Sequence, residues 1–328
     1  MDFRTHVERP QNDVQMRLYD KMMLFGSCFS ENIGSQLSAN KFLCDVNPFG
    51  VLYNPASISK ALLRLCDPKP FKNDDLFFAN DLWNSWMHHS SFSSPDASLC
   101  LQQINQRLSQ SAENLRNTRF LLITFGTAWV YRLKDTRECV ANCHKQPDKL
   151  FDRTLLTKEE IVLEFRQTIA IIRDINPDIQ FILTVSPIRH IKDGLHGNQI
   201  SKATLLLAIE ELCQEIKGIS YVPAYEIMID ELRDYRFYAD DMLHPSSLAI
   251  QYLWECFSDV YLDSSAKTFL RDWQVVNKRL QHKPFNPQSD AYRRFVNDTS
   301  QILNKLQEEH PYLNFQKEIA QCQTLSKL

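Results

Sequence analysis

Two short and almost continuously apolar runs constrain the fold of this chain more than any other feature of its sequence. They are FLLITF at Phe120–Phe125 and QFILTV at Gln180–Val185. Strands of this composition are typical of a sheet that is covered on both faces, as parallel sheets are. Further β-like runs lie at Lys21–Phe25 and Ser220–Pro223. We therefore expect these four strands to belong to one mostly parallel sheet.

Segments with helical periodicity separate these strands along the chain. The clearest start signal is Thr157-Lys-Glu-Glu160, a capping box at the beginning of a helix. Strands that alternate with helices form βαβ units, which predicts an α/β fold. The predicted helices of this part are Ser30–Lys41, Ala56–Cys66, Leu99–Leu115, Thr157–Ile175 and Ser201–Ile216.

Two features depart from this alternation. Trp129–Leu133 and Glu138–Asn142 predict an additional β-hairpin. From Ser247 onward the pattern is helical only, and we divide the chain into a domain of residues 1–262 and a helical C-terminal extension of residues 263–328. The extension is either a cap on the core or a surface for a partner. The helices expected here are Ser247–Val260, Ala266–Leu280 and Asp290–Gln307.

Composition and charge exclude several classes of protein. The chain has 328 residues, of which 44% are hydrophobic and 23% charged, as is typical of globular proteins. The net charge is −3 and no lysine–arginine cluster is present, so we expect no nucleic-acid partner. No apolar run approaches the roughly 20 residues that span a bilayer. Because the N-terminal residues also lack an apolar signal region, we expect a cytoplasmic protein.

Glycine is unusually rare, and its positions are therefore informative. Average usage of about 7% would give roughly 23 glycines in this chain, but there are seven. A chain with so few glycines is expected to keep them mainly where a Cβ atom does not fit. Gly26 and Gly126 both stand where an apolar run ends. We interpret these turns as sites of backbone constraint or of close approach by a ligand, although ordinary strand-end turns are the simpler explanation.

Small and polar residues follow three of the predicted strands. The sequences are Gly26-Ser27-Cys28, Gly126-Thr127-Ala128-Trp129 and Ser186-Pro187-Ile188-Arg189-His190. Ligands of open parallel sheets bind beyond the carboxyl ends of the strands. These three segments therefore predict a binding site at one edge of the sheet.

A late DxxH motif supplies a candidate for acid–base chemistry. Asp241 and His244 are three residues apart, so in a turn their side chains can share one face. A carboxylate beside an imidazole fixes the histidine tautomer and stabilises its protonated form, as a general base requires. The same spacing also occurs where an aspartate caps a helix and the histidine is merely exposed.

The order of these motifs resembles a known family. A G-x-[S/C] turn, a second strand-end glycine and a late DxxH resemble the SGNH (GDSL-like) hydrolases. More closely, the chain resembles the GSCFA family, whose motif is GSCFS at Gly26–Ser30 here, with serine in place of the last alanine. The resemblance implies a three-layer α/β/α sandwich, SGNH- or flavodoxin-like, with a helical extension. Other similar stretches are NPFGVLYNP (Asn47–Pro55), GTAWVY (Gly126–Tyr131), VANCHK (Val140–Lys145), SPIRH (Ser186–His190) and RFYADDMLHPS (Arg236–Ser246).

The resemblance leaves the nucleophile open between two neighbours. Aligned on the G-D-S motif of the SGNH hydrolases, the G-S-C turn implies Cys28 as nucleophile and puts Ser27 in the place of aspartate. A cysteine at a helix N-terminus is stabilised as a thiolate by the helix dipole and free N–H groups, so we expect a lowered pKa for Cys28. Ser27 activated by His244 is the alternative. In a third interpretation, Cys28 is a buried thiol and Ser27 a helix cap.

The oxyanion hole departs from the family pattern. SGNH enzymes use the backbone N–H of the nucleophile, a glycine N–H and an asparagine side chain, and Gly50 resembles the glycine element. The asparagine position falls near Ala128, which has no side-chain donor. Asn54 or the indole N–H of Trp129 would have to replace it. Loss of one such donor costs about 10²–10³ in turnover.

Several histidines lie in or near the family-like segments. We expect His89, His144 and His190 to line the pocket as hydrogen-bonding groups, with Arg189 beside His190 as a candidate anion ligand. A core position for His144, or a solvated loop for Arg189 and His190, is the simpler explanation. Neither HxxxH nor CxxC spacing occurs, so we expect no metal site, and most of the nine cysteines are expected to be reduced thiols. A covalent mechanism needs no cofactor, and we expect none.

Together these features predict acyl transfer. Cys28 or Ser27 attacks a small acyl (acetyl) ester, with a carbohydrate ester as the expected substrate; His244 moves the proton and Asp241 orients it. Water as acceptor gives an esterase, and a sugar hydroxyl gives an O-acyltransferase. A non-catalytic ligand-binding protein and a metal-dependent hydrolase that uses the histidines are the alternatives. The acceptor and the oligomeric state stay open.

Overall fold

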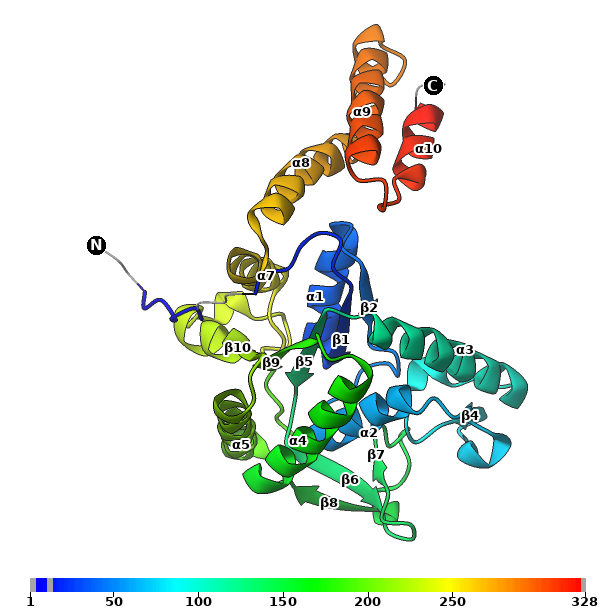
Figure 1. Ribbon diagram of the computed structural model, residues 1–328, viewed down its shortest axis with the longest axis vertical. Helices are drawn as coiled ribbons and strands as arrows, with labels where there is room; N and C mark the ends of the chain where they lie inside the picture. Colours follow the sequence, from blue (N-terminus) through cyan, green and yellow to red (C-terminus); the bar gives the residue numbers. More distant parts are fainter. Residues whose placement is uncertain (1–3, 11–13, 326–328) are drawn as a thin grey trace.

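A five-stranded parallel sheet forms the centre of the computed structural model, which describes residues 4–10 and 14–325 (Figure 1). Neighbouring strands follow the order β10-β9-β5-β1-β2, and every pairing is parallel. The predicted parallel sheet is therefore confirmed, with β2 as an additional edge strand. The strands are β1 (Met22–Gly26), β2 (Cys44–Val46), β5 (Phe120–Phe125), β9 (Gln180–Val185) and β10 (Ile219–Val222).

The strand order determines where the sheet can bind a ligand. Every residue of β1 and β5 is buried, as their apolar sequences predict. The order is that of flavodoxin-like sheets, in which connections leave in opposite directions on either side of one strand pair. Here that pair is β1 and β5, whose register aligns Gly26 with Thr124. The crevice expected at such a switch point lies beyond Gly26 and Phe125.

Helices cover both faces of the sheet, which confirms the three-layer α/β/α sandwich. On one face α1 and α7 pack residues such as Phe29 and Leu253 against Leu24. On the other face α2 to α5 pack residues such as Ile161 against Phe25. Within the described residues, none of the helices combines the length and apolar character needed to cross a bilayer. The longer helices are α1 (Cys28–Ala39), α2 (Pro55–Cys66), α3 (Ala97–Arg116), α4 (Lys158–Ile175), α5 (Gly194–Glu215), α7 (Ser247–Tyr261), α8 (Ser264–Leu280), α9 (Asp290–Glu309) and α10 (Gln316–Leu325), and the short ones are α6 (Ala224–Glu226), Asn73–Asp75, Ser90–Phe92, Asp148–Leu150, Ile227–Glu231 and Tyr235–Phe237.

Two small antiparallel sheets lie outside the central one. The predicted hairpin is confirmed as β6 (Trp129–Leu133) and β7 (Cys139–Val140), and β8 (Phe151–Leu155) pairs with the other edge of β6. A second hairpin consists of β3 (Phe77–Ala79) and β4 (Leu82–Asn84). Because β6 directly follows the turn after β5, the three-stranded sheet stands at the carboxyl edge of the central sheet.

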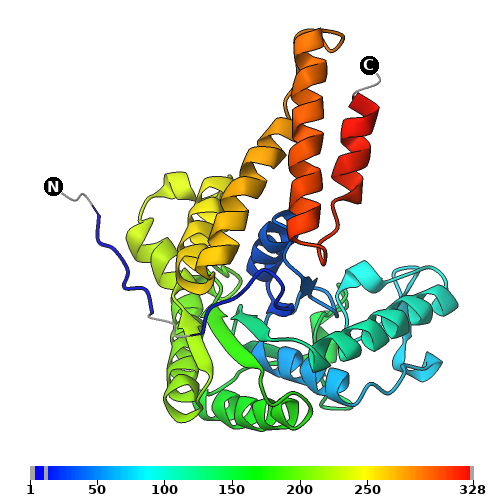
Figure 2. The same cartoon turned by 45° about the horizontal axis from the view of Figure 1, so that its top comes forward.

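The C-terminal helices α8, α9 and α10 project from the sandwich (Figure 2). They are attached at the end of α1 that lies farthest from Cys28. The indole N–H of Trp273 donates to the Ala39 carbonyl at 2.8 Å, and Lys41 pairs with Glu318 at 2.7 Å. Since a 12-residue helix is about 18 Å long, the extension is joined to the core about one helix length from the first residue of α1.

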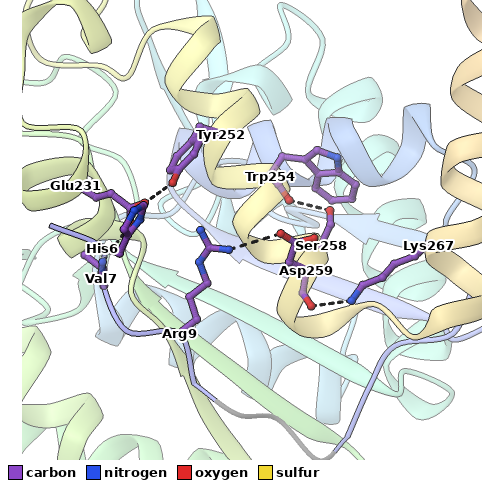
Figure 3. Close-up of polar contacts among 9 residues, drawn as sticks. All are labelled: His6, Val7, Arg9, Glu231, Tyr252, Trp254, Ser258, Asp259 and Lys267. Atoms are coloured by element: carbon purple, nitrogen blue, oxygen red, sulfur yellow. Dashed lines mark hydrogen bonds and ion pairs between the residues drawn. The ribbon is translucent and has the colours of Figure 1, made fainter. Parts of the chain in front are cut away.

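The N-terminal segment crosses the outer surface of α7 (Figure 3). Nδ1 of His6 lies 3.1 Å from a carboxylate oxygen of Glu231, which also accepts a hydrogen bond from the Tyr252 hydroxyl. Arg9 pairs with Asp259 at 3.5 Å. These contacts hold residues 6 to 9 against α7 and against the short helix Ile227–Glu231.

Candidate active site

A cavity of about 480 Å³ opens beyond the carboxyl ends of β1, β5 and β9. This is the edge at which parallel α/β sheets bind ligands, and the volume is in the range of small-molecule sites. The turn after β1 and the late histidine therefore line the same cavity. Of the residues singled out in the sequence, the cavity is lined by Ser27, Cys28, Asn54, Trp129, Arg189, His190 and His244.

Two glycines, Gly26 and Gly126, stand at the strand ends beside this cavity but lie outside its lining, although the sequence predicted both as site residues. Gly26 has φ +142°, and a Cβ atom there would lie 2.4 Å from the Thr124 carbonyl oxygen. Its N–H donates to the side chain of Asn47 at 3.0 Å. A Cβ on Gly126 would lie 2.9 Å from the Tyr53 carbonyl oxygen, which accepts the Gly126 N–H at 2.7 Å. Both glycines therefore allow neighbouring backbones to approach closely.

The Ser27 hydroxyl is engaged within the protein. Ser27 is the N-cap of α1, and its Oγ accepts the Phe29 N–H at 3.3 Å. The same hydroxyl donates to Ser186 Oγ at 3.1 Å, and the residue is only 1% exposed. The hydroxyl therefore already accepts one hydrogen bond in the helix cap and donates another to the residue that follows β9.

Cys28 is the first residue of α1, and its side chain is partly buried. Burial raises the pKa of the Cys28 thiol above the ordinary value, and the nearby Glu31 carboxylate raises it further. The N–H of Cys28 itself and a hydrogen bond from the Tyr53 hydroxyl act in the opposite direction but are smaller. The expectation of a lowered pKa is therefore wrong, because desolvation and a like charge outweigh the helix N-terminus.

Asp241 and His244 form a hydrogen-bonded pair. Nδ1 of His244 lies 2.5 Å from Oδ2 of Asp241. The other oxygen of Asp241 accepts the backbone N–H groups of Leu243 and His244, both at 2.9 Å. These N–H groups and the imidazole lower the pKa of Asp241 to about 2. With Nδ1 held by a carboxylate, Nε2 is the nitrogen available for proton transfer.

Arg189 anchors the loop that carries this pair. Its guanidinium donates to the Met242 carbonyl oxygen and lies 4.4 Å from the ring centre of Tyr238. Its backbone N–H donates to the Leu243 carbonyl oxygen at 3.3 Å. Met242 has φ +59°, so the loop turns sharply at this position. The side chain expected to hold an anion therefore also fixes the position of the DxxH loop.

Gly50 lies outside the cavity lining, in contrast to its expected place in the oxyanion hole. Its N–H donates to the Asn47 carbonyl oxygen at 2.8 Å, so this donor is already used. Gly50 has φ +76°, and a Cβ there would lie 2.3 Å from Cβ of His89. The glycine is therefore explained by a tight turn in the NPFG segment.

Asn54 and Trp129, the proposed replacements for the oxyanion asparagine, both line the cavity. Oδ1 of Asn54 accepts the Ser57 N–H at 2.8 Å as the N-cap of α2, which leaves its Nδ2 amide as a donor. The Trp129 indole N–H is buried without a partner among the described residues, and the Arg153 guanidinium lies 4.2 Å from the centre of the Trp129 ring. Asn54 is therefore the more accessible of the two donors.

The expected pocket histidines separate into two groups. His190 lines the cavity, and burial, with Lys202 nearby, lowers its pKa to about 4. His89 and His144 lie outside the lining. His144 is 6% exposed, and its Nε2 lies 3.0 Å from the Ser85 carbonyl oxygen. His144 is thus a core histidine, and the side chain of His89 caps a short helix.

Lys202 on α5 is a functional candidate that the sequence analysis did not identify. It is 1% exposed, and its ammonium group donates to the carbonyl oxygens of Gly126 and Ser186, both at 2.7 Å. Burial lowers the pKa of Lys202 to about 7. In the sequence this lysine resembles any solvated lysine of an amphipathic helix. It joins the ends of β5 and β9 directly beneath the cavity.

No group of three or more histidine, cysteine, aspartate or glutamate side chains converges on a possible metal position within residues 4–10 and 14–325. The cysteines of this part are all free thiols. The geometry of the histidines therefore lends no support to the metal-dependent alternative.

Fold and site define a three-layer α/β protein with a cysteine and an Asp–His pair around one cavity. The chain belongs to the GSCFA family, whose sequence model matches residues 21–257, and residues 273–327 match the model described as "GSCFA domain protein, C-terminal domain". No curated protein matches the chain in sequence. Among solved structures it is similar to "Crystal structure of a carbohydrate esterase family 3 from Talaromyces cellulolyticus", with 10% identity, 77% of this chain and 99% of that chain covered, and a TM-score of 0.35. So distant a likeness carries no functional argument.

Proposed function

We propose that the protein transfers small acyl groups from an ester, with Cys28 as nucleophile, His244 as general base and Asp241 as the group that orients His244. The observation that carries this proposal is the shared cavity, which is lined by both Cys28 and His244. The Nδ1 contact with Asp241 leaves Nε2 of His244 available, as a base for a thiol requires.

Cys28 is favoured over Ser27 because their side chains are engaged differently. The Ser27 hydroxyl caps α1 and donates to Ser186, so its use as nucleophile would release both contacts. Among the described residues, the partly buried Cys28 thiol is hydrogen-bonded by a single side chain, the Tyr53 hydroxyl. Ser27 then acts as the cap that fixes the start of α1.

The proposed reaction has two steps. The Cys28 thiol transfers its proton to Nε2 of His244 while sulfur attacks the acyl carbon, and collapse of the tetrahedral intermediate expels the alcohol oxygen, which takes that proton. The acyl group is then a thioester on Cys28. In the second step His244 removes a proton from the acceptor, whose oxygen attacks the thioester. The Cys28 sulfur that is expelled takes this proton back from His244, which restores the thiol and the neutral imidazole. Since the resting pKa of Cys28 is raised, the base is needed in the first step.

Two donors near Cys28 are suited to stabilise the oxyanion. The Cys28 N–H lies at the first position of α1, where helix N–H groups have no intrahelical acceptor. The Asn54 amide, which lines the same cavity from the N-terminus of α2, provides a second donor. Water as acceptor makes the protein an esterase, and a sugar hydroxyl makes it an O-acyltransferase. A carbohydrate ester remains the proposed substrate.

Turnover of p-nitrophenyl acetate tests the nucleophile. We expect Cys28→Ala to lower kcat/KM by about 10³-fold or more, and mass spectrometry of the wild-type protein to detect an acetyl group on the Cys28 peptide. Ser27→Ala is the matched control: it is expected to retain turnover and to lose about 1 kcal/mol of stability through the lost cap.

Equal turnover by Cys28→Ala and wild type would contradict the covalent mechanism. Loss of turnover in Ser27→Ala alone, with its fold intact by circular dichroism, would transfer the nucleophilic role to the serine. Absence of turnover in the wild type, with ligand bound in the cavity, would support the non-catalytic alternative.

A further inference from the structure

One wall of the cavity carries an unusual concentration of positive charge. We call Tyr131, Arg153 and Lys192 the cationic wall; all three line the cavity. Tyr131 lies on β6 and Arg153 on β8, so two of them come from the three-stranded sheet. Lys192 belongs to the segment between β9 and α5. None of the three was singled out in the sequence, because only tertiary pairing of β6 with β8 brings them together.

The two cations converge on one aromatic ring. Nζ of Lys192 donates to the Tyr131 hydroxyl at 2.7 Å and lies 5.1 Å from the ring centre. The Arg153 guanidinium lies 5.3 Å from the centre of the same ring. Both cations also act on Cys143, another residue of the cavity lining, where each lowers a thiol pKa that burial has raised. Their fields therefore overlap within the cavity.

The positive charge of the lining exceeds its negative charge. Within the part of the chain that the structure describes, three cations line the cavity, Arg153, Arg189 and Lys192, but only one carboxylate, Asp193. Arg153 holds that carboxylate with two nitrogens. Among the described residues, no carboxylate oxygen lies within 4.0 Å of Nζ of Lys192, and its hydrogen-bond partner is the Tyr131 hydroxyl. The carboxylate of Asp148, which lies outside the lining, also raises the pKa of Lys192.

We infer that the cationic wall binds a negatively charged group of the substrate, a carboxylate or a phosphate, through the ammonium of Lys192 with Arg153 beside it. A lysine ammonium binds either anion, because it acts as a point charge with three donors. The Tyr131 hydroxyl, already bound to Lys192, orients the amine toward the cavity. This inference rests on the proposed function for the ester, but the charge of the ligand is tested separately.

Binding to the full-length protein tests the charge without any need for turnover. Isothermal titration calorimetry would compare glucuronate, glucose 6-phosphate and uncharged glucose. We expect at least one of the two anions to bind about 10-fold more tightly than glucose, since a charge-assisted contact is about twice as strong as a neutral one. The titrations with glucuronate and with glucose 6-phosphate show whether the site binds a carboxylate or a phosphate. Higher salt is expected to weaken anion binding only.

The variants Lys192→Gln and Lys134→Gln distinguish anion binding by the cationic wall from a general effect of positive surface charge. Lys134 is exposed at the end of β6 and does not line the cavity. We expect Lys192→Gln to remove the roughly 10-fold preference for the anion, and Lys134→Gln to keep it. Equal binding of glucose and both anions, or an unchanged preference in Lys192→Gln, would overturn the inference. Failure of the proposed function would appear in a different measurement, as p-nitrophenyl acetate turnover by Cys28→Ala that equals the turnover of the wild type.

Discussion

The floor and the rim of the cavity are built by opposite means. The floor contains buried groups that are fully engaged: Ser27 is bound to Ser186, and the buried Lys202 ammonium joins the Gly126 and Ser186 carbonyl groups. The rim carries His244, whose side chain is 47% exposed and is held by Asp241 in its own loop.

The difference teaches where function and stability reside in this site. A buried hydrogen-bond network is costly to break because its partners are left without water. An exposed pair contributes little to the stability of the fold, yet it supplies the base of the proposed reaction. Changes at the rim should therefore affect turnover, and changes at the floor should affect folding.

The largest expected effect is at the rim. His244→Gln removes the proposed base and is expected to lower kcat/KM for p-nitrophenyl acetate by about 10²–10⁴-fold, with a change in unfolding free energy of no more than about 0.5 kcal/mol. His196→Gln is the matched control, because His196 is exposed and does not line the cavity. If His244→Gln unfolds the protein and His196→Gln does not, the rim contributes to the stability of the fold, which would contradict the expected difference between rim and floor.

A smaller effect is expected at the floor, and it depends on pH. Lys202→Met leaves two buried carbonyl groups without their donor, which should destabilise the fold by about 2–4 kcal/mol at pH 9. Burial lowers the folded-state pKa of Lys202 from 10.5 to about 7, so the unfolded chain binds a proton that the folded chain lacks between these values. The free energy of unfolding attributable to Lys202 therefore rises with pH through this window and is lost as pH falls through about 7.

Urea unfolding at pH 6 and at pH 9 measures this prediction as the difference between wild type and Lys202→Met. Lys278→Met, at an exposed position of α8, provides the control. If the difference in unfolding free energy is equal at both pH values, Lys202 stays protonated in the folded chain. If the difference is negligible, the fold does not depend on the hydrogen bonds that Lys202 donates to Gly126 and Ser186.

Sequence patterns were sufficient for four strands of the central sheet but not for its edge strand β2 or for the strands β3, β4 and β8 outside it. The runs at Phe120–Phe125 and Gln180–Val185 are apolar enough to identify buried strands, and they appear as β5 and β9 with the same bounds. The edge strand Cys44–Val46 has three residues and depends on pairing with β1. The polar strand Phe151–Leu155 likewise forms only because β6 is present. Local sequence carries little information about such strands, since tertiary pairing determines them.

The same limit applies to the candidate site. Glycine scarcity correctly indicated close backbone approach at Gly26 and Gly126. Burial, in contrast, could not be judged from a motif: His144 and Lys202 are both buried, and each has a role that its neighbours in sequence do not suggest. The thiol of Cys28 is the clearest case, because a helix N-terminus favours the thiolate while burial, visible only in the folded chain, opposes it.

The smallest expected effect concerns Cys28, which lies between floor and rim. Its raised pKa predicts that iodoacetamide labelling of the Cys28 peptide, followed by mass spectrometry, has a midpoint above that of an ordinary cysteine. Two variants should move this midpoint in opposite directions. Glu31→Gln removes a carboxylate that raises the pKa and should lower the midpoint, whereas Tyr53→Phe removes a hydrogen bond that lowers the pKa and should raise it. A midpoint well below that of free cysteine would show that the thiolate is already present at rest, and His244 would then be needed only to protonate the leaving group.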